Sequence, residues 1–227
     1  MMTYKEFISE GINDPGIFKV VFVAGGAGSG KSFVAEKSGL RALGLRPLNS
    51  DDALEAFIKK EKKSMKLNEL SPEEMKEIND IRTRAKKTTK NKLNLLTHGK
   101  IGVFVDSTAK EYDKIKRQKS QFESLGYDAY MIFVNTSLDI AKKRNSERAR
   151  TVPDKILEKT WNEAQNNIGK FQNLFGGKNF IIVDNDNAGE KIFTSVFKRM
   201  KKFISIPVTN HIATKWMELE RKIRSKK

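Results

Sequence analysis

A glycine-rich segment near the amino terminus has the residue types and spacing of a phosphate-binding loop. Residues 25–32 fit the pattern G-x-x-x-x-G-K-[ST], with an apolar run before them and a helical pattern after them. Glycines let the backbone wrap closely around an anion and turn its N–H groups inward. Lys31 would reach the β- and γ-phosphates of ATP, and the Ser32 hydroxyl would ligate Mg²⁺. The segment therefore predicts ATP and Mg²⁺ as cofactors, with the nucleotide held by Gly25, Gly26, Ala27, Gly28, Ser29, Gly30, Lys31 and Ser32.

Carboxylates follow two other expected strands. Asp106 ends the apolar run 101–105, in the place of a Walker-B-like acid that holds Mg²⁺ through water or contacts the acceptor. Asp51 and Asp52 follow a weaker strand candidate at 45–50, and a carboxylate there can accept the proton of an attacking hydroxyl. Helix capping is the alternative for these acids, and one of the Asp51–Asp52 pair is expected to cap a helix over 53–59.

A basic segment after the fourth expected strand has the features of a lid. Arg144 and Arg148 are four residues apart and therefore share one face of a helix. Two guanidiniums that converge from a lid can neutralise charge on a transferred phosphoryl group. The alternative is a solvated basic cluster on the surface.

Short apolar runs that alternate with longer helical patterns must position these residues. The expected strands are 19–24, 45–50, 101–105, 129–134 and 180–183. Strands that alternate with helices indicate βαβ units and a parallel sheet covered on both faces. The carboxyl ends of such strands face a ligand crevice, and the candidate residues follow those ends. The sequence therefore predicts an α/β fold with the candidate site at the carboxyl edge of the sheet.

A long charged stretch, 53–97, exceeds what a plain crossover needs. Ser71-Pro72-Glu73-Glu74 predicts a helix start, with Ser as N-cap, Pro at the first position and acids in the first turn. The helix that follows has two interpretations: a solvated charged face, or a basic wall beside a substrate groove. Its basic residues are Arg82, Arg84, Lys86, Lys87, Lys90 and Lys92.

Positive charge is concentrated toward the carboxyl terminus. The formal net charge is +16, and eleven basic but only three acidic residues lie between 190 and 227. The apolar spacing over 190–204 predicts a core-packing helix that ends at Ile206-Pro207, and 209–227 reads as a second, basic helix or a partly ordered tail. Such a surplus favours nucleic acid as a partner, with a merely solvated surface as the alternative.

Composition excludes several other classes. The 227 residues contain no cysteine and two histidines, which excludes disulfide scaffolds, zinc–thiolate sites and a cysteine nucleophile, and disfavours a His-rich metal centre. No apolar run approaches the roughly 20 residues of a membrane span, and the first residues lack the apolar core of a secretory signal. We expect a soluble, cytoplasmic protein without a membrane partner; its oligomeric state stays open.

With these residues in view, the chain resembles the 5′-kinase domain of bacteriophage polynucleotide kinase, within the P-loop kinases that include zeta-toxin-like enzymes. The resemblance spans roughly 18–176 and is most specific over 143–157. It implies a sheet of order 2-3-1-4-5, ATP-dependent phosphorylation of a hydroxyl and, for a phage protein, location in the host cytoplasm. It places Asp51 at the general base and Arg148 at the lid arginine.

The resemblance also implies boundaries and shows departures. We expect a P-loop kinase domain over 1–204, with a helical lid at about 144–172, and a basic C-terminal extension over 205–227. The family's substrate-contacting arginine is Leu54 here, and an asparagine after Asp106-Ser107 is Thr108, which puts the acceptor in question. Asp184-Asn185-Asp186 mimics the start of a phosphatase loop, but we interpret it as the turn after the fifth strand.

The expected function is an ATP-dependent kinase that phosphorylates a hydroxyl of nucleic acid, either a 5′-OH end or a hydroxymethylated base. Lys31, Asp51, Arg144 and Arg148 would be catalytic, Asp51, Asp52, Asp106 and Thr108 would contact the acceptor, and Ser32 with Asp106 would hold Mg²⁺. A small-molecule kinase that acts on a nucleoside, nucleotide or nucleotide sugar is the alternative. A nucleotide-dependent nucleic-acid-binding module without transfer is a third possibility, in which Asp51 and Arg148 would be expendable.

Overall fold

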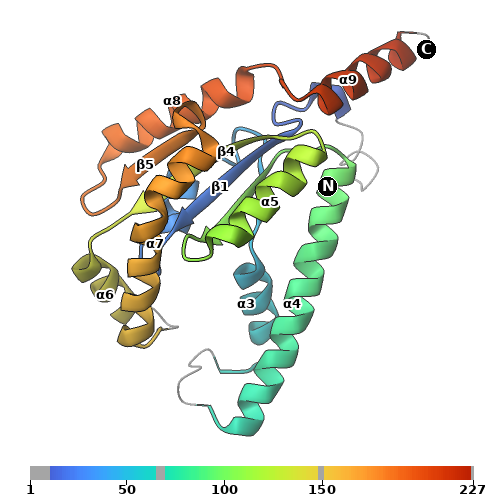
Figure 1. Cartoon of the computed structure of the whole chain (residues 1–227). Helices are drawn as coiled ribbons and strands as arrows, with labels where there is room; N and C mark the ends of the chain where they lie inside the picture. Colours follow the sequence, from blue (N-terminus) through green and yellow to red (C-terminus); the bar gives the residue numbers. More distant parts are fainter. Residues whose placement is uncertain (1–10, 65–69, 148–150, 226–227) are drawn as a thin grey trace.

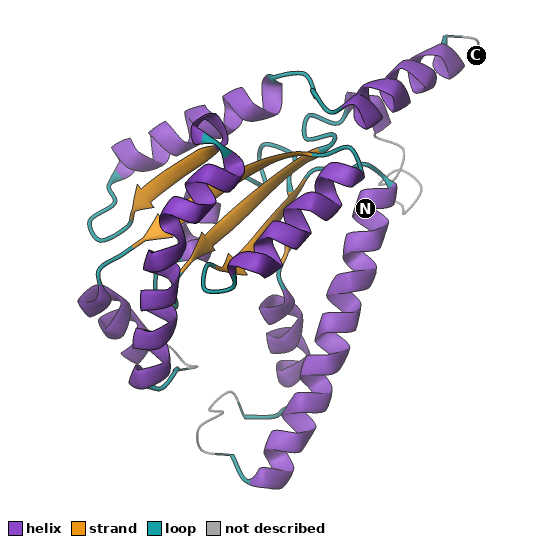
Figure 2. Ribbon diagram, viewed as in Figure 1, coloured by secondary structure: helices purple, strands orange, loops and turns teal. Residues whose placement is uncertain are grey.

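A five-stranded parallel sheet forms the centre of the protein. The computed structural model describes residues 11–64, 70–147 and 151–225. The strand order is β2-β3-β1-β4-β5, which confirms the predicted α/β fold and the order 2-3-1-4-5. The central strand, β1 (Lys19–Gly25), is buried along all seven residues, as its β-branched and aromatic composition predicts. The arrowheads of the strands point toward one edge of the sheet (Figure 2).

The other four strands lie close to their predicted positions. They are β2 (Arg46–Leu48), β3 (Val103–Thr108), β4 (Asp128–Asn135) and β5 (Phe180–Asp184). The prediction that Asp106 ends its strand is wrong, because β3 continues to Thr108 and Asp106 stands opposite Val23 in the parallel register. The strand also begins later than expected, at Val103. The polar carboxyl end of β3 belongs to the site edge, where solvent and ligands replace a packed core.

Helices cover both faces of the sheet, as predicted (Figure 1). One core lies beneath α5 (Tyr112–Ser124) and α7 (Asp154–Phe175) and includes Phe122, Phe171 and Phe175. The other lies beneath α2 (Lys31–Lys37) and α8 (Glu190–Ser205) and includes Val34, Val196 and Met200. Short 3-10 helices, η1 (Gly11–Asn13) and η3 (Gly177–Asn179), and α6 (Leu138–Ser146) complete this part of the chain.

A helical hairpin extends away from the carboxyl edge of the sheet. It consists of α3 (Ser50–Lys60) and α4 (Pro72–His98), which pack through a third, small core of Leu54, Ile58, Ile78, Ile81 and Ala85. The predicted start of α4 is confirmed: Ser71 and Glu74 form a reciprocal capping box, with Pro72 at the first position. With 27 residues, α4 is about 40 Å long and runs from the end of the hairpin to the edge of the sheet (Figure 1).

The carboxyl-terminal segment forms helix α9 (His211–Arg224), the first of the two forms expected for it. Its first half packs on the main core, because Ala213 is buried and the Trp216 ring meets Phe18 edge-on at 5.5 Å between centroids. Its second half projects beyond the body of the molecule (Figure 1). Across the described residues, every helix is either too short or too polar to cross a lipid bilayer.

A buried ion pair joins this segment to the amino end of the sheet. The Lys19 side chain is 2% exposed, and its ammonium lies 3.0 Å from Asp128 Oδ2. Asp128 also accepts hydrogen bonds from the backbone N–H and hydroxyl of Thr209, at 3.2 and 3.1 Å. The Lys19 ammonium stands over the Phe203 ring, 4.8 Å from its centroid. One carboxylate therefore compensates a buried cation and anchors the connection between α8 and α9.

Removal of the Asp128 carboxylate should destabilise the folded protein. We expect Asp128→Ala to lower the free energy of unfolding by about 3–5 kcal/mol, because it leaves the Lys19 ammonium buried without its counter-ion. Urea unfolding followed by circular dichroism measures the change. Lys19→Met combined with Asp128→Ala should recover part of the lost free energy of unfolding. As a control, Asp80→Ala on the exposed face of α4 should change the free energy of unfolding of the wild type by less than about 0.5 kcal/mol. A loss below about 1 kcal/mol for Asp128→Ala would contradict this account.

Candidate active site

The predicted phosphate loop connects β1 to α2. Gly28 and Gly30 have φ angles of +76° and +82°, in the left-handed region that favours glycine. A Cβ on Gly28 would come within 2.5 Å of the Ala141 carbonyl oxygen, and one on Gly30 within 2.4 Å of Asn185 Nδ2. The loop is thus packed against neighbouring elements on its outer side. The residues predicted to bind the nucleotide, Gly25 to Ser32, span the end of β1, the loop itself and the first two residues of α2.

The loop lysine folds back over the loop itself. Lys31 Nζ donates hydrogen bonds to the carbonyl oxygens of Gly25 and Gly26, at 3.3 and 3.0 Å. These carbonyls hold the ammonium at the mouth of the loop, where the outer phosphates of a nucleotide would lie.

A single asparagine forms hydrogen bonds with three of the predicted acidic residues, two through their carboxylates and one through its backbone. Asn49 Nδ2 donates to Asp52 Oδ1 at 2.9 Å and to Asp106 Oδ2 at 3.3 Å. Asn49 Oδ1 accepts from the backbone N–H of Asp51 at 2.9 Å and so caps α3. The expectation that Asp51 or Asp52 caps this helix is therefore wrong: the helix begins at Ser50, and both acids lie within its first turn. The capping alternative for Asp106 is also wrong, because α5 begins only at Tyr112.

These residues line one large cleft. It has a volume of about 1130 Å³ and runs from the phosphate loop to the space between α4 and α5. The structure brings most of the predicted site residues to its wall: Ala27, Lys31, Ser32, Asp51, Asp52, Asp106 and Thr108. Lys31 and Ser32 stand at the loop end, and Asp51 faces the same space from α3, so a bound phosphate and a proton acceptor share one cavity.

Oxygen donors for a metal ion are present beside the loop. The Ser32 hydroxyl and the Asp106 carboxylate both line the cleft next to Lys31, and Mg²⁺ prefers such hard oxygen ligands while keeping several waters. The described residues hold no group of three or more His, Asp or Glu side chains suited to a metal. The donors present therefore fit an ion held jointly by protein and nucleotide.

The turn after β5 supports the loop from behind, a role that the sequence did not reveal. Asn185 is buried, and its Nδ2 donates to the Ser29 carbonyl at 2.8 Å. Its backbone N–H donates to Asn135, and its own carbonyl accepts from Arg144 Nη2 at 2.7 Å. The prediction that 184–188 forms a turn after the fifth strand is confirmed, and this turn links three separate elements.

The next residue of that turn anchors helix α6, whose last residues begin the predicted lid. The Asp186 carboxylate accepts from the Thr136 hydroxyl and, at 2.8 Å, from the Ser137 N–H. Burial acts to raise the pKa of Asp186, but these hydrogen bonds and the nearby Arg144 outweigh it, so the pKa lies below its ordinary value. The start of α6 is therefore tied to an ionised carboxylate at neutral pH.

The structure describes part of the predicted lid. Arg144 lies near the end of α6, and its Nη1 is within 3.5 Å of a Cβ built on Gly30, so its guanidinium stands against the phosphate loop. The Asn145 side chain exchanges two hydrogen bonds with the Val152 backbone, at 2.7 and 2.9 Å, and Lys142 pairs with Glu158 of α7. Arg148 lies outside the described residues, so its predicted role stays a prediction.

Solved structures show this fold in proteins of low sequence identity. A protein described as a kinase from Chloroflexus aurantiacus J-10-fl is 13% identical, with a TM-score of 0.50 over 82% of this chain and 97% of that one. A structure from the PezAT chromosomal toxin–antitoxin system of Streptococcus pneumoniae is 12% identical, with a TM-score of 0.55 and 82% of each chain covered. Shikimate kinase from Bacteroides thetaiotaomicron is 13% identical, with a TM-score of 0.48 over 83% and 99%. At such identities the likeness shows the fold alone.

Sequence comparison places the chain in a family. No curated protein matches it. Residues 20–170 match AAA_33, described as an AAA domain, and this range contains the phosphate loop, Asp51, Asp106 and Arg144. The match spans more than half of the sequence, from β1 into α7. The chain therefore belongs to the AAA_33 family of AAA domains and has the P-loop kinase fold.

Proposed function

We propose that the protein is a kinase that transfers the γ-phosphoryl group of ATP to a hydroxyl group of a small acceptor bound in the cleft. One observation carries this proposal: Lys31 and Ser32 of the phosphate loop line the same cavity as the Asp51 carboxylate. A module that only binds nucleotide has no need of a carboxylate facing the phosphate loop across an open cavity. Family membership supports the ATP-binding half of the proposal.

The proposed reaction uses these groups in turn. Lys31 and the loop N–H groups hold the triphosphate, and Ser32 with Asp106 would hold Mg²⁺, which when bound neutralises phosphate charge. The acceptor oxygen forms a bond to the γ-phosphorus while the bond from that phosphorus to the β–γ bridging oxygen breaks, and ADP leaves. Asp51 takes the hydroxyl proton. Arg144 and the predicted partner Arg148 would stabilise charge on the transferred group.

Two features favour a small acceptor over a polynucleotide. The first is that Leu54, at the position of the polynucleotide kinases' phosphate-contacting arginine, is 2% exposed and packs in the α3–α4 core. That position faces away from the cleft and offers no cation to a substrate. The second is the cleft volume of about 1130 Å³, which suits a molecule of nucleotide or nucleotide-sugar size. The comparisons support a P-loop kinase without specific support for a polynucleotide kinase.

Phosphorylation of a nucleic-acid hydroxyl stays as the second candidate. The observation in its favour is the basic surface of α8 and α9, with exposed side chains at Lys198, Arg199, Lys201, Lys202, Lys215, Arg221 and Lys222. The α8–α9 connection is tied to Asp128, the first residue of β4, whereas the cleft lies at the carboxyl ends of the strands. Nucleic acid held by α9 would therefore contact the end of the sheet opposite the cleft.

The role of Asp51 separates a kinase from a binding module. We expect Asp51→Asn to lower kcat by about 10²–10⁴-fold, because the amide cannot accept the hydroxyl proton, and to change the affinity for ATP less than about three-fold. Transfer from γ-labelled ATP across a panel of nucleosides, nucleotides, sugars and 5′-hydroxyl oligonucleotides measures the first quantity, and calorimetry measures the second. Asp80→Asn on α4 is the charge-matched control, and Lys31→Ala is the blank. Full turnover in Asp51→Asn would refute the assignment.

Support of the loop by Asn185 should appear in nucleotide affinity. We expect Asn185→Ala to raise KM for ATP by about 5–20-fold, with a smaller change in kcat, because one buried hydrogen bond to the Ser29 carbonyl is lost. Asn185→Asp should be worse than alanine, since a carboxylate would then face that carbonyl and the bound phosphates. Steady-state kinetics at saturating acceptor provides the measurement. Asn187→Ala, an exposed asparagine in the same turn, should behave as wild type; equal effects in both variants would contradict the argument.

The second candidate has its own test. We expect a variant with Lys215→Glu, Arg221→Glu and Lys222→Glu to bind single-stranded DNA about ten-fold more weakly. The slope of log K against log salt concentration should become shallower by the amount that corresponds to two to three phosphate contacts. Transfer to a small acceptor should be unchanged, because these side chains lie far from the cleft. Fluorescence anisotropy at several salt concentrations gives the affinities. If the triple change abolished transfer to every acceptor while the fold persisted, the small-acceptor reading would be refuted.

A further inference from the structure

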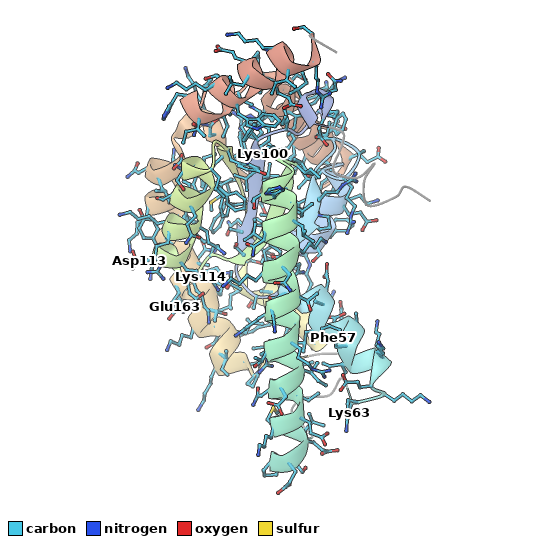
Figure 3. The ribbon with its side chains drawn as sticks, turned by 90° about the vertical axis from the view of Figure 1, so that its right-hand side faces the viewer. Phe57, Lys63, Lys100, Asp113, Lys114 and Glu163 are labelled. Atoms are coloured by element: carbon cyan, nitrogen blue, oxygen red, sulfur yellow. The ribbon has the colours of Figure 1, made fainter. Side chains whose placement is uncertain are left out.

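One face of α4 forms a wall of the cleft. Lys86, Thr89, Lys90 and Leu93 all line it, at the spacing i, i+3, i+4 and i+7 of a single helix face. Figure 3 shows α4 toward the viewer, with Phe57 of α3 on one side of it and Lys114 of α5 on the other. The cleft is thus lined by residues from separate elements. Lys31 and Ser32 of the phosphate loop form part of its lining, and Lys86 and Lys90 of α4 form another part.

Other basic residues of α4 serve the hairpin itself. Arg82 Nη1 donates to Asn79 Oδ1 at 2.7 Å. Arg84 pairs with Glu61 and lies over the Phe57 ring, 5.6 Å from its centroid. By contrast, within the described chain no carboxylate lies within 4 Å of the Lys86 or Lys90 ammonium. The structure therefore divides the predicted basic wall into residues that hold α3 to α4 and residues whose charge faces the cleft.

The acids that line the cleft come from α3, which packs against α4, and from β3; they are Asp51, Asp52, Glu55 and Asp106. Asp52 and Asp106 both accept from Asn49, so a neutral amide holds them on the α3 and β3 side. Lys114 on α5 also lines the cleft, but it donates to Glu111. Further along α4, burial and the neighbouring Arg41 and Arg46 lower the pKa of Lys92, against the opposing effect of Asp52.

We infer that the acceptor carries a phosphate group, and that Lys86 and Lys90 of α4 bind it while the acceptor hydroxyl faces Asp51. This inference rests on the proposed function and names its substrate class. α3 offers no cation at position 54, because Leu54 is packed in the hairpin core, and its one lysine in the cleft lining is Lys59. Lys86 and Lys90 are one helical turn apart on α4, so they can bind one phosphate group together. Transfer to the hydroxyl would yield ADP and a product with one more phosphoryl group than the acceptor.

The experiment compares acceptors with and without a phosphate group. The pairs are uridine with uridine 5′-monophosphate, glucose with glucose 6-phosphate, and thymidine with a 5′-hydroxyl oligothymidylate. Transfer from γ-labelled ATP is measured for the wild type, for Lys86→Ala with Lys90→Ala, and for the matched control Lys76→Ala with Lys87→Ala, which are exposed lysines of the same helix outside the cleft wall. The oligothymidylate arm distinguishes a backbone phosphate from that of a small molecule.

We expect the phosphate-bearing member of at least one pair to be preferred. Loss of the two cleft lysines should lower kcat/KM for that member about ten-fold or more, and for its neutral partner less than two-fold, because only the former loses charge-assisted hydrogen bonds. Lys86→Arg with Lys90→Arg should restore most of the activity, and the control pair should not differ from wild type. Equal use of neutral and phosphorylated partners, or equal losses in the cleft and control variants, would overturn the inference while leaving the kinase intact.

Binding gives a readout that does not depend on turnover. Calorimetric titration of the same compounds is done with ADP and Mg²⁺ in excess, so that the phosphate loop is filled and cannot take the ligand's phosphate. The cleft variant should bind the phosphorylated compounds about ten-fold more weakly than the wild type and the control variant. If no acceptor is phosphorylated but this difference is present, the proposed function fails and the phosphate site stands; phosphorylated compounds bound no better than neutral ones would overturn the site.

Discussion

The phosphate loop has no room for side chains on its outer side, and the rest of the site depends on that close packing. A Cβ on Gly25, Gly28 or Gly30 would lie within 2.4–2.5 Å of atoms from β4, α6 and the turn after β5. Three elements distant in sequence thus press on one turn of backbone. Because the glycines allow this approach, the loop N–H groups can face the cleft while the opposite side is held by the body of the protein.

Two asparagines connect the ends of neighbouring strands to residues of the site. Asn49 connects the end of β2 to the Asp106 carboxylate of β3, and it also caps the helix that carries Asp51. Asn185 connects the end of β5 to the Ser29 carbonyl and, through its own carbonyl, to Arg144. Asn49 donates and accepts through its side-chain amide, whereas Asn185 donates through its side chain and accepts through its backbone carbonyl, so neither link adds charge. The acidic and basic groups of the site are thus positioned by neutral residues, which leaves their charges for ligands.

Local patterns made the central parts of this site predictable from sequence. The phosphate loop, the helix start at Ser71 and the five strands each depend on residues close together in the chain, while the strand order followed from the resemblance to a known family. The role of Asn185 was not predictable, because its partner Ser29 is 156 residues away. The cap of α3 was assigned wrongly because Asn49, Asp51 and Asp52 are all good capping residues, and only the end of β2 at Leu48 decides among them. The extent of β3 was missed because its polar end serves the cleft and shows no apolar signal.

The net charge of +16 is a poor guide to the substrate until its parts are placed in the structure. Some cations form ion pairs within the protein, as Arg84 does with Glu61 in the hairpin and Lys19 does with Asp128. Others cover the outer surface of α8 and α9, and the connection between these helices is fastened to the amino end of the sheet. Only a few, Lys31, Lys86 and Lys90 among them, face the cavity where chemistry would occur. A polyanion attracted by the whole protein and an anion recognised in the cleft are therefore separate physical problems, because they involve different residues at opposite ends of the same strands.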